Sequence, residues 1–444
     1  MSSSASVSVV VGERSNRRGA IKGLLRSPRF PWLWTLLVTI LTVILTLSRR
    51  PDSIIHAQFW AEDGNRWYAN AYNWGWIAAT LTSAGGYFQT LSRLTAALSL
   101  LVDLRYAPAV YGVVALVVQV LPAAFLVTPR FSRVIPDFRI RLLLAFLYIG
   151  LPNSFELHIN ITNAMTHLGL LAALVILAEP SHRTAWRAFD LAVLVLSGLS
   201  GPFVIALAPV AFLRSITARH DRWRLVVLSV VIFCAAVQAL SVLTAGPSAR
   251  PHGALGATIH GFMAILAGNV FAGAEIGLFH YTQLFAQEWW NPHSQALRLA
   301  FLVGMAVFAY AAARGPLELR LFILFGWIML TAALLTPVVS LTGDQWPLLS
   351  HPGAGDRYYE IPMLAFLASV VWMMTRSGVP VLRILGGLLI AATLLVGMPT
   401  DWAYPPYTDM HPARYADILD RAAPGTRVVI PINPPGWTIE LVKR

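Results

Sequence analysis

The chain has few charged residues for its length. Only 12% of its 444 residues are Asp, Glu, Lys or Arg, compared with roughly a quarter in an ordinary soluble domain. Apolar residues make up 57%, and the mean hydropathy is +0.63. A water-soluble protein of this size could not bury so much apolar surface, because the share of surface that a core absorbs is limited by chain length. The composition therefore excludes a soluble globular enzyme and indicates a membrane protein.

Cysteine is almost absent. The single Cys234 lies in an apolar segment, which excludes a disulfide framework and a zinc–thiolate site. Four histidines between residues 246 and 295 lack metal-ligand spacing, so no metal site is expected; they are His252, His260, His280 and His293. No internal repeat is visible, which weakens the case for a transporter built from two related halves.

Long apolar runs dominate the rest of the chain. Several of them approach the length that crosses a hydrocarbon core of about 30 Å as a helix, and none alternates as a barrel strand would. The sequence predicts an all-α polytopic protein with about 10 to 12 crossings. The segments are 31–48, 88–104, 106–127, 141–155, 162–178, 190–213, 225–243, 296–313, 320–338, 359–375 and 382–399.

A net charge of +12 invites a nucleic-acid interpretation, but the basic residues cluster beside the spans. This placement is typical of cytoplasmic loops, so we expect membrane lipids as partners and no nucleic acid. The clusters are Arg14, Arg17, Arg18, Lys22, Arg26 and Arg29 before the first span, and Arg214, Arg219, Arg222 and Arg224 between two later spans.

The chain divides into three parts. Residues 1–30 are expected to form a basic cytoplasmic tail, 31–399 the membrane domain, and 400–444 an extracytoplasmic tail too short to fold alone. Within the membrane domain, 49–87 is rich in tryptophan and predicts surface-lying helices in a first outer loop. The stretch 244–295 has very few basic residues and predicts a second long outer loop. We expect a bacterial plasma-membrane protein with its N-terminus in the cytoplasm.

Two places conflict with a simple alternation of spans. The segment 190–213 is interrupted by Gly201-Pro202 and has basic residues on both sides, which favours a hairpin of two short helices over one straight span. If 88–104 and 106–127 both cross, four arginines near residues 130–141 lie on the outer side, against the positive-inside rule. Either one segment does not cross fully or the rule fails there.

Two adjacent carboxylates follow the first span. Glu62 and Asp63 lie in the segment Phe59–Gly64, FWAEDG. Neighbouring carboxylates near hydrocarbon repel each other, and the resulting rise in one pKa suits a general base. Asp63 is equally suited to cap a helix that begins at Gly64 or Asn65. The spacing leaves both roles open.

A carboxylate in the first outer loop, followed by surface-lying helices, resembles the GT-C superfamily of membrane glycosyltransferases. Those enzymes take a sugar from a polyprenyl-phosphate or polyprenyl-diphosphate carrier. The resemblance covers the general layout of the chain and implies that Asp63 is the catalytic base, with Glu62 as the second choice. It also implies a second acidic residue from the next outer loop, which corresponds to Glu156. No subgroup signature is present, so donor and acceptor stay open.

A second polar cluster follows Pro152. The spacing of Glu156, Asn160, Asn163 and His167 predicts one face of a helix that enters the bundle beside His158. Polar groups at membrane depth face a cavity or one another. The cluster thus predicts either a substrate-binding surface or a polar contact between helices.

An arginine flanked by tyrosine precedes a late span. The guanidinium of Arg357, beside Tyr358, suits a lipid phosphate, and Arg93 is a further phosphate-binding candidate. Interfacial anchoring by a tyrosine and a snorkelling arginine explains the same pattern.

These observations favour a glycosyltransferase with a lipid-linked sugar as donor and a glycan, lipid or protein as acceptor. A phosphate leaving group needs little acid help, so one base and a cationic clamp suffice, and a divalent cation is compatible with the scheme. The alternatives are a transporter or flippase, which would need a polar path through the bundle, and an envelope polysaccharide polymerase or ligase.

Overall fold

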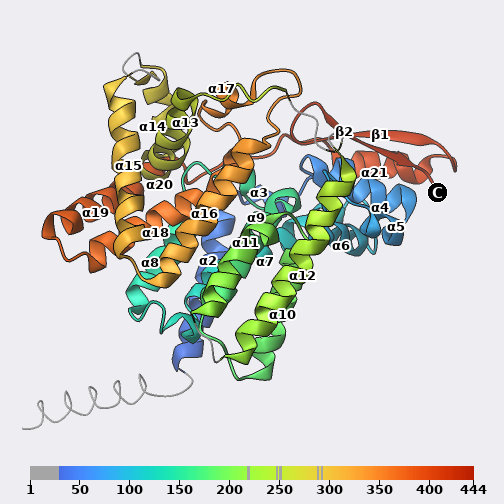
Figure 1. Ribbon diagram of the computed structural model, residues 1–444. Coiled ribbons are helices and arrows are strands. Elements are labelled where there is room, and N and C mark those ends of the chain that lie inside the picture. The colour runs from blue at the N-terminus through green and yellow to red at the C-terminus, as the bar shows by residue number, and fades with distance from the viewer. Residues whose placement is uncertain (1–29, 218–220, 247–248, 250–252, 288–289, 292–293) are drawn as a thin grey trace, which may run out of the picture.

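The computed structural model describes residues 30–217, 221–246, 249, 253–287, 290–291 and 294–444. This part of the chain is mostly helical, with one two-stranded sheet near the C-terminus (Figure 1). Within it, six helices are long and apolar enough to cross a membrane, and three shorter helices are apolar. A membrane-embedded helical protein is therefore supported, with fewer clear spans than the 10 to 12 expected. The basic cluster of residues 14–29 lies outside the described residues.

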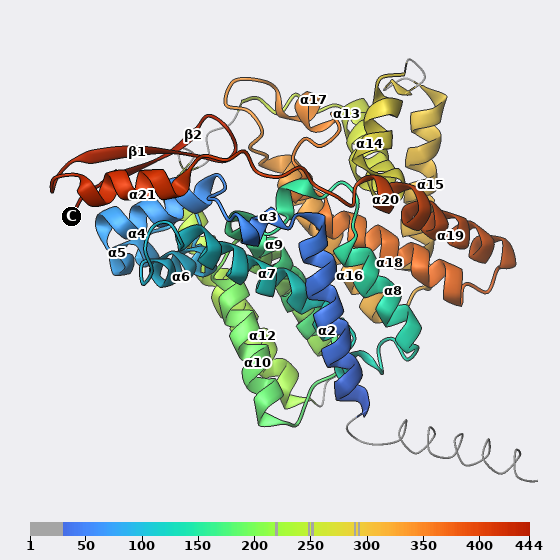
Figure 2. The ribbon, with the colours of Figure 1, turned by 180° about the vertical axis from the view of Figure 1, so that it is seen from behind.

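Most of the long helices run between two ends of the molecule, whereas α18 (Glu360–Arg376) and α19 (Pro380–Ala392) lie obliquely to the others (Figures 1 and 2). We call the end that holds loops 127–137, 178–183 and 377–379 the arginine end, and the end that holds 50–106, 150–160, 336–359 and 401–444 the Glu156 end. The long helices are α2 (Phe30–Arg49), α7 (Ala107–Leu126), α8 (Phe138–Ile149), α9 (Ile161–Leu177), α10 (Thr184–Gly198), α11 (Phe203–Ile216), α12 (Arg222–Ala245), α15 (Gln295–Arg314), α16 (Leu317–Leu335), α18 (Glu360–Arg376) and α19 (Pro380–Ala392).

Helix α6 (Thr90–Ser99) accounts for the conflict over the four arginines. Its 10 residues extend about 15 Å, half of a hydrocarbon core, so the expected crossing at 88–104 is wrong. It lies at the Glu156 end with the other first-loop elements, which are α3 (Asp52–Ile55), η1 (Asp63–Tyr68), α4 (Ala69–Trp74) and α5 (Trp76–Leu81). Because only α7 crosses, loop 127–137 shares the arginine end with Arg214, as the positive-inside rule requires.

The hairpin at Gly201-Pro202 is confirmed. The first turn of α10 and the last turn of α11 both lie at the arginine end. There Arg130 pairs with Asp190 at 2.9 Å and Arg214 pairs with Glu318 at 2.8 Å. The tip turns at Gly201, whose φ of +136° is costly for any residue with a side chain. Beside it, Ser200 forms a β-bridge with Gln89 of the first loop.

The stretch 244–295 contains α13 (Ile259–Ile265), η5 (Leu266–Ala272) and α14 (Gly273–Phe285). Their 27 residues would suffice for a span, but the helix bends at Gly277, where φ is +76°. Both arms end beside α17 (Gln345–Leu349) and the residues after it: Phe262 lies 6.3 Å from Trp346 and Phe285 lies 4.9 Å from His351, between ring centroids. The segment thus doubles back toward the Glu156 end. His252 and His293 lie outside the described residues.

The C-terminal tail is folded, contrary to the expectation that it is too short. Helix α21 (Pro412–Arg421) precedes an antiparallel hairpin of β1 (Arg427–Ile432) and β2 (Trp437–Val442). The hairpin covers the loop after α2 (Figure 2), where Asn65 and Asn73 donate side-chain hydrogen bonds to carbonyls of β2 at 2.6 and 2.8 Å. A Cβ on Gly64 would lie 2.5 Å from Ile439, so this close packing requires glycine. The tail is stable because it packs on the loop.

Candidate active site

The first-loop carboxylates are held against the C-terminal tail. Trp60 forms a β-bridge with Asn433, and Ala61 donates its backbone N–H to the Asn433 carbonyl at 2.5 Å. Ala61 has a φ of +43°, so the chain turns sharply just before Glu62. The Asn433 side chain is buried and bonds to Thr408 and Gln58. This turn presents two adjacent carboxylates to different surroundings.

Asp63 is buried and fully engaged. Its Oδ1 accepts hydrogen bonds from the backbone N–H of Thr162 at 2.8 Å and from the Thr162 hydroxyl at 2.7 Å. Its Oδ2 accepts one from the backbone N–H of Ile161 at 3.1 Å. Asp63 therefore caps the N-terminus of α9, a helix distant in sequence, and not the helix that begins beside it. Burial raises the pKa of Asp63 to about 7, although these three hydrogen bonds act in the opposite direction.

Glu62 is the more accessible carboxylate of the two. It is half-buried at the start of η1. Within the described residues its carboxylate has no hydrogen bond or ion pair. Of the two first-loop acids, Glu62 is thus the one free to accept a proton from a bound molecule.

Glu156 and Arg357 form a direct ion pair. Glu156 lies in the short turn η3 (Phe155–Leu157) and Arg357 in η7 (Asp356–Tyr358). Their side chains are 24% and 29% exposed, so the pair is open to solvent or a ligand. Arg357 also donates to the Val338 carbonyl at 2.8 Å and lies over the Tyr358 ring at 4.8 Å. The sequence-predicted partners are therefore brought together, with a fork-shaped cation at the surface.

The expectation of one helical face from Glu156 to His167 is wrong. The chain leaves helical geometry at Ile159, whose φ is +44°, and α9 begins only at Ile161. Asn160 and Asn163 both donate their side-chain amides to the Glu156 carbonyl, at 2.7 and 2.9 Å. They fix the loop that carries Glu156. Spacing alone misled here because a turn separates Glu156 from α9, the helix that carries Asn163 and His167.

The two predicted histidines are buried in polar contacts between helices. His167 lies 3.0 Å from Glu360 of α18 and 3.1 Å from the Tyr148 hydroxyl of α8. His158 lies 3.3 Å from the amide of Gln119. Both are almost fully buried, which agrees with the helix–helix alternative considered for this cluster.

Arg93 belongs to the environment of Asp63. Its guanidinium lies 4.9 Å from the centroid of the Trp67 ring, and Trp67 donates to the Thr162 hydroxyl at 3.1 Å. Arg93 is buried, and its Nε and Nη1 have no hydrogen-bond partner within the described residues. An uncompensated buried cation is costly, so this position suits an anion.

Sequence reasoning did not identify Arg50 as part of the site. Its guanidinium lies 4.4 Å from the ring centroid of Phe155, which precedes Glu156, and 4.5 Å from that of Tyr407. Tyr407 stacks on Trp60, two residues before Glu62, with centroids 5.4 Å apart. Arg50 is buried and its Nη2 has no partner within the described residues. The pair Arg49-Arg50 at the exit of the first span was the only sequence signal.

Two buried aspartates were also not predicted. Asp356, next to Arg357, has its pKa raised well above the usual range by burial and by the charge of Glu156. Asp401 accepts from the backbone N–H groups of Asn153 at 2.9 Å and Leu278 at 2.5 Å, which ties three outer segments together. Within the described residues, no group of three or more His, Cys, Asp and Glu is placed to hold a metal ion.

Comparison with known proteins gives no match: neither a protein-family model nor a curated protein sequence is similar to this chain.

Proposed function

We propose that the chain is a glycosyltransferase that uses a polyprenyl-phosphate sugar as donor and works at the Glu156 end. The observation that supports this most directly is the partly exposed ion pair of Arg357 and Glu156. A second cation, Arg50, is buried over the ring of Phe155, the residue before Glu156. Two arginines beside tyrosine rings suit an anionic phosphate at a membrane interface.

Glu62 is the base in this scheme. It removes the proton of an acceptor hydroxyl while the hydroxyl oxygen forms a bond with the anomeric carbon. The bond from that carbon to the phosphate oxygen breaks, and polyprenyl phosphate leaves with the electron pair. Asp63, which the resemblance to the GT-C superfamily implies as the base, instead holds the first loop on α9, because both of its oxygens already accept hydrogen bonds.

The arginines hold the leaving phosphate. Arg357 exchanges its bond to Glu156 for a bidentate bond to the phosphate, and Arg50 adds a second positive charge. Glu156 shields Arg357 when no donor is bound. The cytoplasmic N-terminus, the external C-terminus and the plasma-membrane location are parts of the same proposal, since they place the Glu156 end outside.

The test measures sugar transfer in proteoliposomes that contain the purified protein and a radiolabelled polyprenyl-phosphate sugar. Glu62→Gln should lower transfer by about 10²- to 10⁴-fold, the usual contribution of a general base. Asp409→Asn, which changes an exposed carboxylate at the same end, is the matched control. Movement of the intact lipid-linked sugar across the bilayer without transfer would favour a flippase, and growth of a polymeric product would favour a polymerase.

A further inference from the structure

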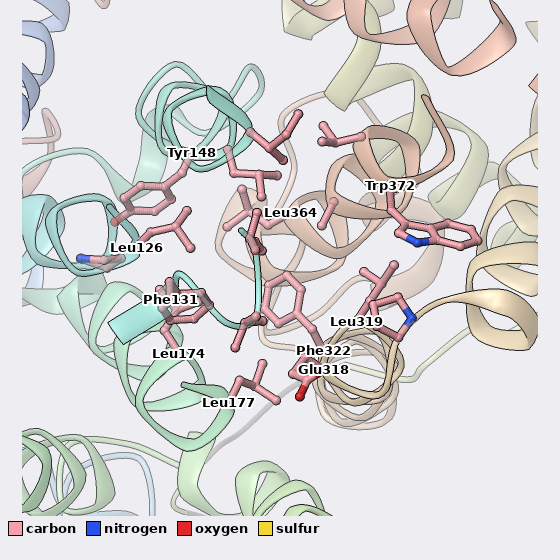
Figure 3. A pocket seen from close by; sticks show the side chains of 18 of the residues that line it. Leu126, Phe131, Tyr148, Leu174, Leu177, Glu318, Leu319, Phe322, Leu364 and Trp372 are labelled. Atoms are coloured by element: carbon pink, nitrogen blue, oxygen red, sulfur yellow. The ribbon is translucent and has the colours of Figure 1, made fainter. Parts of the chain in front are cut away.

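A large apolar cavity lies between helices of the bundle (Figure 3). It has a volume of about 470 Å³ and lies between α8, α9, α16 and α18, with contributions from α7 and the loop after it. The side chains that line it are mostly aliphatic or aromatic, among them Leu126, Leu144, Leu174, Phe322, Leu364 and Trp372. Its size falls within the range of small-molecule sites, and its lining suits a hydrocarbon and not water.

The cavity is long enough to hold a large part of an acyl chain. Along α18 its lining extends over thirteen residues, from Leu364 to Arg376, or about 18 Å of helix. Half of a hydrocarbon core is about 15 Å. Ile140, Phe322 and Trp372 are only half-buried although they line the cavity, so it is accessible from outside the bundle.

The charges gather at one end of this cavity. Arg133 and Arg376 belong to its lining, both are exposed, and both lie at the arginine end. Arg376 has no ion pair within the described residues. Arg133 pairs there only with Glu179, at 3.7 Å, and the Arg133 side chain is 81% exposed. The acidic residue of the lining, Glu318, is neutralised by Arg214 at 2.8 Å. The mouth of the cavity is therefore positive.

We propose that this cavity binds an anionic phospholipid of the leaflet at the arginine end. One acyl chain fills the apolar cavity, and the phosphate headgroup binds Arg133 and Arg376. Basic pockets between membrane helices bind such headgroups. The site is separate from the proposed transfer reaction, because Glu62, Glu156 and Arg357 lie at the opposite end of the bundle. A polyprenyl-phosphate donor bound there would present its phosphate at the wrong end of this cavity.

Native mass spectrometry of the full chain in detergent, titrated with phosphatidylglycerol or phosphatidylcholine, tests the proposal. The wild type should retain one phosphatidylglycerol in preference to phosphatidylcholine. Arg133→Ala with Arg376→Ala should weaken phosphatidylglycerol binding by roughly ten- to thirty-fold, because each arginine contributes to headgroup attraction. The matched control is Arg139→Ala with Arg314→Ala, two exposed arginines of the same end outside the cavity lining.

A second variant tests the acyl-chain part. Ala368→Trp fills the cavity without changing a charge and should reduce phosphatidylglycerol retention. In the wild type, a photoactivatable phosphatidylglycerol should crosslink to peptides of α8 and α18. This experiment does not depend on whether any variant folds. If Arg139→Ala with Arg314→Ala weakens phosphatidylglycerol binding equally, the binding depends only on general surface charge and the proposed site is wrong. Equal retention of phosphatidylcholine, or crosslinks confined to other helices, would overturn it as well.

Discussion

Asp63 closes the N-terminus of α9 through Thr162, whose backbone N–H and hydroxyl both donate to its Oδ1, at 2.8 and 2.7 Å. This contact joins the first outer loop to a helix almost one hundred residues later. A carboxylate at a helix N-terminus satisfies unpaired N–H groups and interacts favourably with the helix dipole. The neighbouring Glu62 is left available for chemistry.

The two first-loop carboxylates should respond differently to loss of charge. Glu62→Gln should abolish nearly all transfer while leaving thermal stability within about 0.5 kcal/mol, as for most surface changes. Asp63→Asn should lower stability by about 1–3 kcal/mol, because the Asn amide group faces N–H donors and leaves one unsatisfied. Transfer rates and thermal unfolding of both variants, measured in the same detergent, check this.

The opposite order would restore the role that the resemblance to the GT-C superfamily implies for Asp63. If Asp63→Asn folds with normal stability and loses transfer, while Glu62→Gln keeps it, Asp63 is the base and the cap is secondary. The glycosyltransferase proposal would survive that result. It would fail if both variants transfer sugar normally.

The stability of the fold should depend on pH through Asp63. Its pKa is about 7 in the folded chain and near 3.9 in an unfolded one. Between these values the folded chain retains a proton that the unfolded chain releases, so this stabilising contribution is complete below about pH 4 and is lost as pH rises through 7. The slope is at most about 1.4 kcal/mol per pH unit.

Thermal unfolding of the wild type and of Asp63→Asn, followed from pH 4.5 to 7.5, measures this contribution. The stability advantage of the wild type should shrink as pH rises. An advantage that grows instead would mean that the hydrogen bonds from Ile161 and Thr162 outweigh burial and keep Asp63 ionised.

The orientation of the bundle can be tested by cysteine labelling. Met410→Cys lies in the C-terminal tail at the Glu156 end, and Arg139→Cys lies at the arginine end. A membrane-impermeant maleimide should label intact cells at position 410 and should reach position 139 only after permeabilisation. Native Cys234 is buried and gives little background. Labelling of position 139 in intact cells would invert the proposed topology.

The sequence predicts the helical class well because apolar length and basic clusters report directly on membrane spans. It also predicts the hairpin at Gly201-Pro202, because both flanking loops are basic and a Gly-Pro pair breaks a helix. It fails at the apolar segment 88–104, because the helix α6 within it is only ten residues long and leaves Leu94 and Leu98 exposed. Hydropathy does not show whether an apolar segment forms a helix long enough to cross.

The site was predictable in its residue types but not in their contacts. The proximity of Glu156 to Arg357, 201 positions apart, depends on how two loops fold back at one end of the bundle, and no local pattern encodes it. The sequence predicts that Asp63 could cap the helix that follows it, because spacing along the chain can indicate only local caps. The aromatic surroundings of Arg50 depend in the same way on Tyr407 from the C-terminal tail.

Changes to the ion pair of Glu156 and Arg357 should alter the use of the lipid-linked donor. Arg357→Lys keeps the charge but loses the planar fork, so the catalytic efficiency with the lipid-linked donor should fall by about tenfold or more. Glu156→Gln should leave the turnover number nearly unchanged and lower KM for the donor, because Arg357 no longer has to exchange a carboxylate for the phosphate. Steady-state kinetics with varied donor concentration separate the two effects.

The double variant decides whether Glu156 acts through Arg357 alone. If it does, adding Glu156→Gln to Arg357→Lys should change transfer far less than Glu156→Gln changes the wild type, since the two side chains share one interaction. Tyr358→Phe, which removes a hydroxyl 3.3 Å from Arg357 but no charge, is the control for a general disturbance of the turn η7. Independent, additive losses from Glu156→Gln in both backgrounds would instead make Glu156 a catalytic residue in its own right, in keeping with the second acidic residue that the resemblance to the GT-C superfamily implies.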